Sequence, residues 1–223
     1  MRIEKEGPTV IEGRHQRVSF LVCIPTLGTV PIEFHVAASR LAMPVNAISQ
    51  SLIVSKTEVG VARQYAAEFV LNAQPRPRYL LFLGDDMLPP WDGVIKLWQE
   101  MEEGNWDVLA GLYFIKQDLP VPIIWRNDVV GPLEVHKHYQ PGEVVPCDVV
   151  GMDFTLIRPS VFEKIEKPFF KTGPGKDMDP GGGLTVYTED VYFCSKVRAA
   201  GLKIGCHTGV RVSHLYSKTG EVW

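Results

Sequence analysis

The feature that most constrains the fold is the apolar run Tyr79–Leu83, which is followed directly by Gly84 and two adjacent aspartates. A run with no charged position fits a strand that is buried on both faces of a parallel sheet. In open α/β sheets, ligands bind where such strands end. Asp85 and Asp86 stand at that point, and paired carboxylates suit a Mg²⁺ or Mn²⁺ ion that also binds substrate phosphates. An acidic turn without a binding role has the same composition, so this stretch alone fits both interpretations.

The first half of the chain alternates between predicted strands and predicted helices. Apolar runs predict strands over 19–24, 47–55, 79–83 and 107–113. The helical spacing of apolar residues predicts helices over 31–43, 59–72 and 90–104. In the second of these helices, the stripe expected to face the core is Val61, Ala62, Tyr65, Ala66, Phe69 and Val70. The resulting βαβαβαβ order is typical of a doubly wound, mostly parallel sheet that helices cover.

The second half of the chain changes character. Five prolines within 115–150 predict an irregular, hairpin-rich insertion. Further strands are expected over 147–157, 203–206 and 210–213, and helices over 159–165 and 189–200, the last capped by Thr188. The Gly/Pro-rich segment 171–183 predicts a mobile loop.

These elements predict one α/β domain with a Rossmann-like core. We expect a flexible N-terminal extension over 1–17 and a single domain over 18–223. Its first half spans 18–113, and its smaller β-rich second half spans 114–223.

Composition excludes several classes of function. The formal net charge of −3 provides no electrostatic footprint for nucleic acid. No apolar run approaches the roughly 20 residues of a transmembrane helix, and no signal peptide is evident, which leaves only a peripheral membrane contact open. The four cysteines lack paired spacing, so we expect reduced thiols and a cytoplasmic protein. The sequence contains no indication of the oligomeric state.

Four features fall in a fixed order along the chain: Pro25-Thr26 after the first strand, Arg63, the aspartate pair, and Glu189-Asp190 at the start of a late helix. This order resembles the nucleotide-sugar glycosyltransferases of the GT-A fold, closest to glycosyltransferase family 2. The resemblance covers about residues 18–214 and rests on the segments VCIPT, VARQYAAEFV, YLLFLGDDMLPP, VVGMDFTLIRPSVF and TEDVYFCSKVRAAGLKIG. It implies transfer of a sugar from a UDP- or GDP-sugar to a carbohydrate or other acceptor hydroxyl.

The resemblance implies a Mn²⁺ or Mg²⁺ site at a DxD-type motif. Here the triplet is Gly84-Asp85-Asp86, with glycine in place of the first acid, so Asp86 and then Asp85 are the expected ligands. The family often adds a histidine near the chain end, which matches His214, with His207 as a rival. A lone histidine is also commonly a surface or core residue without a metal.

The resemblance also implies that 18–113 is the nucleotide-binding half and 114–223 the acceptor-side half. Pro25 and Thr26 would lie against the nucleotide base, and Arg63 would contact the base or the diphosphate. Trp91, beside the aspartates, is a further donor-site candidate. The segment that contains Met152 and Asp153 corresponds to the acceptor side, where Asp153 also fits a solvated strand break.

An inverting transfer needs a carboxylate that accepts the proton of the acceptor hydroxyl. Glu189-Asp190 matches the motif that supplies this base, with Asp190 the better match, although acids in a first helical turn also simply complement the helix dipole. Three alternatives stay open: a retaining transferase, a sugar nucleotidyltransferase, and a non-catalytic carbohydrate-binding relative. The nucleotidyltransferase fits less well because the segment PTLGTVP contains no Lys or Arg. Gly84 favours the non-catalytic alternative.

Overall fold

The structure is a computed structural model, and it describes residues 10–11, 14–15, 18–115, 121–126, 134–135, 139–174, 186–216 and 219–222. The expected extension over 1–17 and the expected loop over 171–183 lie largely outside these residues.

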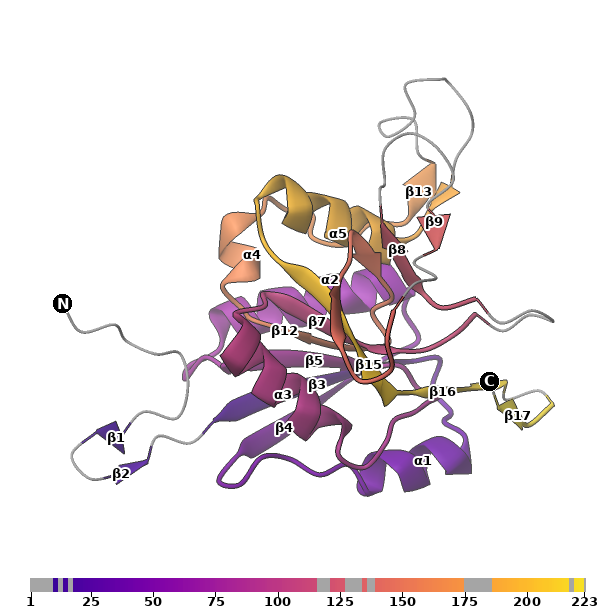
Figure 1. Ribbon diagram of the computed structural model, residues 1–223, viewed down its shortest axis with the longest axis horizontal. Coiled ribbons are helices and arrows are strands. Elements are labelled where there is room, and N and C mark those ends of the chain that lie inside the picture. Colours follow the sequence, from indigo (N-terminus) through magenta and orange to yellow (C-terminus); the bar gives the residue numbers. More distant parts are fainter. Residues whose placement is uncertain are drawn as a thin grey trace.

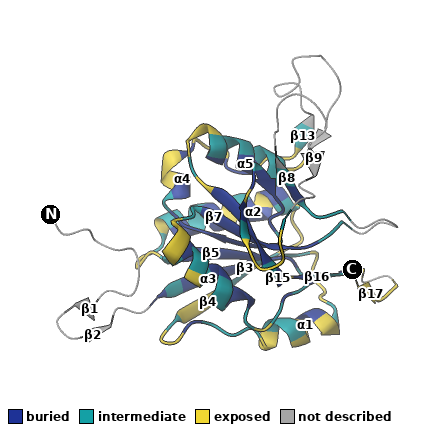
Figure 2. Ribbon diagram, in the orientation of Figure 1, coloured by how far each residue is buried: buried dark blue, intermediate teal, exposed yellow. Residues whose placement is uncertain are grey.

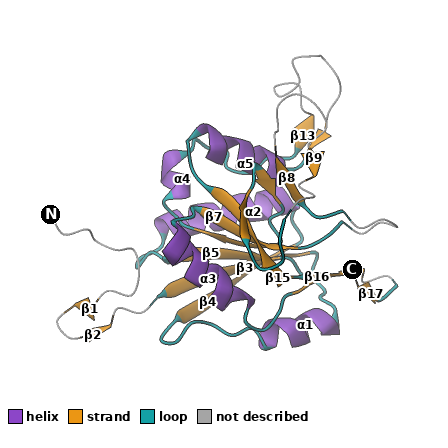
Figure 3. Cartoon of the chain, in the orientation of Figure 1, coloured by secondary structure: helices purple, strands orange, loops and turns teal. Residues whose placement is uncertain are grey.

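A seven-stranded sheet forms the centre of the molecule, in the order β10-β15-β7-β12-β5-β3-β4. In chain order these strands are β3 Ser19–Thr26, β4 Ile48–Ser55, β5 Tyr79–Leu83, β7 Val108–Leu112, β10 Val144–Pro146, β12 Phe154–Ile157 and β15 Ile204–Arg211. β3 pairs in parallel with β4 and β5, and β7 pairs in parallel with β15. β12 runs antiparallel between β5 and β7, and β10 runs antiparallel to β15. The predicted α/β class with a mostly parallel sheet is therefore confirmed (Figure 3).

Helices cover both faces of this sheet. They are α1 Ile32–Ser39, α2 Val59–Asn72, α3 Gly93–Gly104, α4 Val161–Lys164 and α5 Glu189–Ala199. Apolar side chains of α2, α4 and α5 join one core, and those of α1 and α3 join a second core on the opposite face. Figure 1 shows α4 and α5 on one side of the sheet and α1 on the other.

Short strands surround the central sheet. β1 Val10–Ile11 pairs with β2 Arg14–His15, and β13 Gly173–Pro174 pairs with β14 Val186–Tyr187. β8 Ile124–Arg126 lies between β9 Glu134–Val135 and β11 Val149–Val150. β16 Ser213–Tyr216 lies between β6 Met87–Leu88 and β17 Glu221–Val222. The pairing of β6 with β16 brings the chain end to the aspartate motif.

Burial follows the layers. Every residue of β5 and β7 is buried, as the apolar runs predict, whereas the edge strand β4 is largely exposed (Figure 2). The four cysteines are buried and free, in agreement with the expected reduced thiols. None of the helices in the described part of the chain is both long and apolar enough to cross a membrane.

The predicted core stripe of α2 is partly wrong. Val61 and Tyr65 are 57% and 52% exposed, whereas Arg63 is only 3% exposed. The face toward the sheet carries small residues such as Ala62 and Ala66, which let the helix lie close. Arg63 can enter this face because buried carboxylates satisfy its charge.

Two other elements differ from their predicted extent. α1 ends at Ser39 rather than at residue 43, because the chain leaves the helix and the Ala42 amide donates to the Trp91 carbonyl. The run 147–157 divides into two strands in different sheets, and its second half, β12, enters the central sheet antiparallel to its neighbours.

Candidate functional site

Most of the residues singled out from the sequence gather at one edge of the central sheet. β3 ends at Thr26, β5 ends just before Gly84, and β7 ends just before Tyr113. These strands run in the same direction, so the segments that follow them emerge at the same edge. Asp153 comes just before the antiparallel strand β12 and therefore lies at this edge as well.

A hollow of about 320 Å³ opens at this edge, between the end of β3, the start of α2 and the segment after β5. Four carboxylates line it, those of Glu58, Asp85, Asp86 and Asp153. A concave surface with this much negative charge attracts cations. Pro25 and Thr26 line the same hollow.

Asp86 and His214 face each other although 128 residues separate them in the chain. The pairing of β6 with β16 causes this, since Met87 lies opposite His214 and the Leu215 amide donates to the Asp86 carbonyl. His214 Nε2 lies 3.2 Å from Asp86 Oδ2, and its Nδ1 lies 2.9 Å from the carbonyl oxygen of Phe114.

The environment of His214 decides which ring nitrogen carries the proton. A carbonyl oxygen can only accept, so Nδ1 is the donor to Phe114. In the neutral ring, Nε2 then presents its lone pair to the Asp86 carboxylate. Nε2 and Asp86 Oδ2 are thus close enough for one proton or one cation to lie between them.

Asp85 is half-buried beside the other acids. Burial raises the pKa of Asp85 above its ordinary value, and the Asp86 and Asp153 carboxylates raise it further. A hydrogen bond from the Thr26 side chain opposes this shift. A cation in the hollow would favour the ionised form of Asp85 and so offset the cost of holding several acids together.

Arg63 is buried beneath the hollow. One terminal nitrogen of its guanidinium group donates to Asp153, and the other donates to Glu189. The central carbon of the guanidinium group, Cζ, lies 5.8 Å from the centroid of the Phe82 ring. Burial alone would lower the pKa of Arg63, but the two carboxylates outweigh it and raise that pKa. The group is therefore a fixed cation that holds two acids from distant segments. It does not reach into the hollow as the predicted donor contact requires.

Asp153 occupies the space beside Gly84. A Cβ atom on Gly84 would lie 3.0 Å from Asp153 Cβ and 3.1 Å from its Oδ1. The position that is acidic in a full DxD motif therefore carries no side chain here, and the carboxylate next to it belongs to the residue just before β12. The Tyr113 hydroxyl donates to Asp153 Oδ2 and accepts from the Asp153 amide, both at 3.2 Å.

Tyr113 connects this acid to the histidine. Its ring lies edge-on to the ring of His214, with centroids 5.8 Å apart. Burial and the Asp153 charge raise the pKa of Tyr113 well above its ordinary value, so its hydroxyl stays protonated and available as a donor. Tyr113 thus contacts both the acid beside Gly84 and the histidine opposite Asp86.

Glu189 and Asp190 begin α5 and have different surroundings. Glu189 is buried against Arg63. Asp190 accepts from the Thr188 hydroxyl and from the Val191 amide, so Thr188 binds this acid instead of capping the helix. Burial raises the pKa of Asp190, and these hydrogen bonds and Arg63 only partly oppose the shift.

Three candidates lie elsewhere. Trp91 is 64% exposed and lines a separate hollow against α1, not the acidic one. Met152 is fully buried, so its side chain cannot contact an acceptor as predicted. The rival histidine, His207, lies inside β15, where its Nδ1 accepts from the Gly209 amide.

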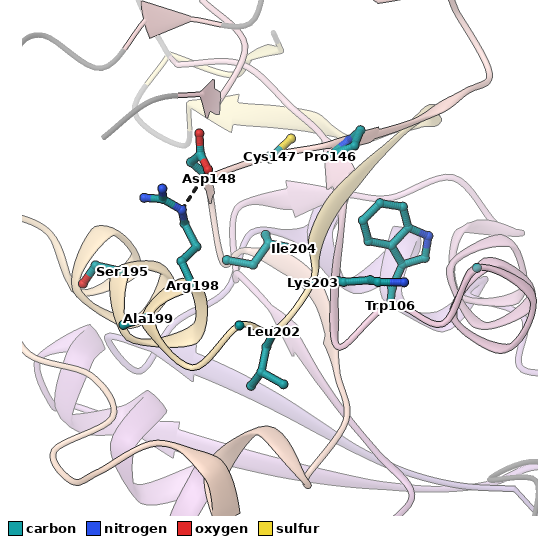
Figure 4. A pocket seen from close by; sticks show the side chains of 12 residues that line it. Trp106, Pro146, Cys147, Asp148, Ser195, Arg198, Ala199, Leu202, Lys203 and Ile204 are labelled. Carbon is teal, nitrogen blue, oxygen red and sulfur yellow. Dashed lines mark ion pairs between the residues drawn. The ribbon is translucent and has the colours of Figure 1, made fainter. Parts of the chain in front are cut away.

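A larger hollow of about 790 Å³ lies at the opposite edge of the sheet, where β7 and β15 begin. Figure 4 shows Trp106 and Lys203 on one side of it and the ion pair between Arg198 and Asp148, 2.8 Å long, on the other. Its charges are already paired in part, and none of the acids described above lines it. Size alone therefore does not identify the site.

Sequence reasoning missed two residues of this edge, Glu58 and Tyr113. Glu58 caps α2 by accepting from the Val61 amide, and it also accepts from Thr172. Its position after β4 is a signal that could have identified it, since it follows a parallel strand and precedes a helix. Tyr113 follows β7 in the same way.

Two solved structures show what the chain is similar to. Protein A197 from STIV is 22% identical over 93% of each chain, with a TM-score of 0.61. GalNAc-T7, solved with UDP, GalNAc and Mn²⁺, is 11% identical, with a TM-score of 0.56 over 89% of this chain and 43% of that chain. The chain has a GT-A-like fold. At these identities the likeness concerns the fold, and it does not assign the chain to glycosyltransferase family 2.

Comparison with protein-family models yields no match, and comparison with curated protein sequences yields none either. Function must therefore be argued from the GT-A-like fold together with the geometry of its acidic edge.

Proposed function

We propose that the protein is a glycosyltransferase that moves a sugar from a UDP- or GDP-sugar to an acceptor hydroxyl, with inversion. The observation that carries this proposal is the pairing of Asp86 with His214 beside an acidic hollow at the carboxyl edge of the sheet. The GT-A-like fold and the neighbour solved with UDP, GalNAc and Mn²⁺ support it.

The side chains at this edge fit a Mn²⁺ or Mg²⁺ ion. A carboxylate oxygen and an imidazole nitrogen 3.2 Å apart suit Mn²⁺, and the Phe114 carbonyl fixes the ring in the manner of an outer-shell partner. The described residues include no group of three or more His, Cys, Asp or Glu arranged to hold a metal. Asp86 and His214 would therefore hold the ion as a pair, and diphosphate oxygens and water would complete its coordination, with Asp85 as an acid of the same hollow. When bound, such an ion stabilises the charge that develops on a departing nucleoside diphosphate.

The remaining walls of the hollow suit the nucleotide. Pro25 and Thr26 offer an apolar ring and a hydroxyl at the end of β3, and we assign them to the nucleotide base. Arg63 is a positioning residue in this proposal, because both of its terminal nitrogens already bind carboxylates. Asp153, which is about one-third exposed, is the acid available to an acceptor hydroxyl.

Asp190 is the proposed general base. Glu189 is neutralised by Arg63, which leaves Asp190 as the acid at the start of α5 that can take a proton. A raised pKa makes a carboxylate a stronger base at neutral pH, and two hydrogen bonds hold this one in place.

The test is calorimetric titration of the protein with UDP and with GDP, each with and without Mn²⁺. We expect one of the two nucleotides to bind only when Mn²⁺ is present. The Asp86→Asn variant should bind that nucleotide about tenfold to 100-fold more weakly than the wild type. Asp92→Asn is the matched control, since Asp92 pairs with Lys96 at the start of α3 and lies outside the hollow. Equal binding by Asp86→Asn and by the wild type would contradict the metal site.

A further inference from the structure

The two edges of the central sheet are built differently. β10 is three residues long and ends in Pro146, which cannot donate a hydrogen bond. β4 at the other edge is eight residues long, ISQSLIVS, with no proline, glycine or charged side chain. Natural sheets usually protect a long edge with such residues, because its free backbone groups recruit another strand. β4 lacks this protection.

The register of β4 shows which of its groups are free. The Ile48 amide donates to Val18, and the Lys56 amide donates to Thr26, so the even-numbered residues of β4 bond inward to β3. Backbone groups alternate along a strand, so the odd-numbered residues direct their N–H and C=O outward. These residues are Ser49, Ser51, Ile53 and Ser55. Within the described part of the chain, β4 is the last strand of its sheet, and no strand bonds to these groups.

Apolar side chains accompany this free edge. Ile48 and Ile53 are 48% and 65% exposed, and Val45, just before the strand, is 90% exposed. Side chains alternate along a strand, so Ile48 and Ile53 lie on opposite faces of the sheet, and each leaves apolar surface beside the outward-directed backbone groups.

We infer that β4 pairs antiparallel with β4 of a second copy of this chain, forming a two-fold dimer with a continuous sheet. A second copy fits because the strand carries no charge, so no like charges meet across the two-fold axis. When the axis passes through Leu52, Ser49 lies opposite Ser55 of the other copy and Ser51 lies opposite Ile53. All four outward-directed residues then find partners, and the two Leu52 side chains meet.

This dimer leaves the acidic hollow of each copy open. The hollow lies at the carboxyl end of the strands, and antiparallel pairing places the two hollows at opposite edges of the joined sheet. The inference is therefore independent of the proposed activity.

Sedimentation velocity over a wide concentration series tests it. We expect a wild-type species of twice the chain mass, and a dissociation constant at least about tenfold higher for Ile53→Lys and for Ser51→Pro. Ser51→Pro removes an outward N–H and spares the bonds to β3. Val45→Lys adds the same charge outside the strand at a more exposed position, and it should dimerise more strongly than Ile53→Lys.

Cross-linking tests the register. In a pair without mutual hydrogen bonds, opposed Cα atoms are about 4.5 Å apart, within disulfide range, so Leu52→Cys should link two copies on oxidation. In Ser55→Cys the two thiols would be roughly 20 Å apart and should not link. The four native cysteines are buried, which keeps the background low.

Three results would overturn the inference. One is a wild type that is monomeric at every concentration. Another is a dimer that both Ile53→Lys and Ser51→Pro leave intact. The third is a monomeric wild type that dimerises once residues 1–17 are removed, since that segment of the same chain would then occupy the edge.

Discussion

At the scale of single residues, the site depends on contacts between positions that are remote in sequence. Asp86 meets His214, and Asp153 fills the space beside Gly84. The sequence motif GDD therefore does not include every acid at this edge, because Asp153 comes from the segment just before β12. Two variants test individual side chains at this edge, Asp190→Asn and Gly84→Ala.

Asp190→Asn should spare donor binding and remove transfer, with kcat lower by about 10²–10⁴-fold. Burial raises the pKa of Asp190, so the acid limb of the wild-type rate profile should lie above the ordinary value of 3.8. The pKa of Asp190 is higher in the folded protein than the value of 3.8 for an ordinary Asp, so the free energy of unfolding of the wild type falls as the pH rises through that range. Asn cannot ionise, so the variant should be at least as stable as the wild type at neutral pH. Rates across pH and thermal melts measure both effects. A near-wild-type kcat would mean that Asp190 only complements the helix dipole at the start of α5.

Gly84→Ala tests the place of Asp153. The new Cβ would lie 3.0–3.2 Å from three atoms of the Asp153 side chain, so that side chain must move away from Arg63 or from Tyr113. We expect a loss of transfer of about tenfold or more, because small misplacements at a site are costly. Gly220→Ala serves as a control, since no atom lies within 4 Å of its added Cβ, although its positive φ adds local strain. Unchanged transfer by Gly84→Ala would show that Asp153 does not need its present position.

At the scale of elements, Arg63 ties α2 to β12 and to α5. Removing it leaves two carboxylates without their buried cation, so Arg63→Met should lower the free energy of unfolding by about 3–5 kcal/mol. Arg76→Met is the comparison, because the pair of Arg76 with Glu163 is largely exposed and such pairs contribute about 0–1 kcal/mol. Urea unfolding measures both. If both variants lost the same small free energy of unfolding, water would be solvating the carboxylates of Asp153 and Glu189 once Arg63 is removed.

The strands themselves explain why the site forms where it does. β3, β5 and β7 end at one edge, while α2 and α5 begin there, so the polar ends of five elements share a small region. β12 adds Asp153 because it runs in the opposite direction and therefore begins where its neighbours end.

At the scale of the whole molecule, ligand binding should report on global stability. If the hollow binds a nucleoside diphosphate with Mn²⁺, a ligand concentration of 100 times Kd adds about 2.7 kcal/mol to the stability of the folded state. For a chain of this length that corresponds to a rise in Tm of about 5–10 °C. Melting curves with UDP or GDP, with and without Mn²⁺, test this, and Asp86→Asn should show a clearly smaller shift at the same ligand concentration, because its affinity is lower. A shift of equal size in that variant would place binding elsewhere.

The sequence by itself determined the layered α/β architecture. The apolar runs that form β5 and β7 favoured strands buried on both faces, and the helical spacing over 59–72 matches α2 at both ends. These features are local, because burial on two faces and a periodic stripe are visible in a short window of residues. The order of the polar motifs along the chain likewise pointed to the carboxyl edge of the sheet.

Only the tertiary structure decided the contacts within that edge. Side-chain type could not show that α2 turns Arg63 inward, because burial of a charge depends on partners that Asp153 and Glu189 supply from other segments. It could not show that β12 runs antiparallel, that β16 brings His214 to Asp86, or that Trp91 faces away. Nor did it reveal that β4 is the last strand of its sheet within the described residues, since strand order is set by the packing of the whole sheet. Short-range patterns determine elements, whereas pairing across long sequence separations determines which side chains meet.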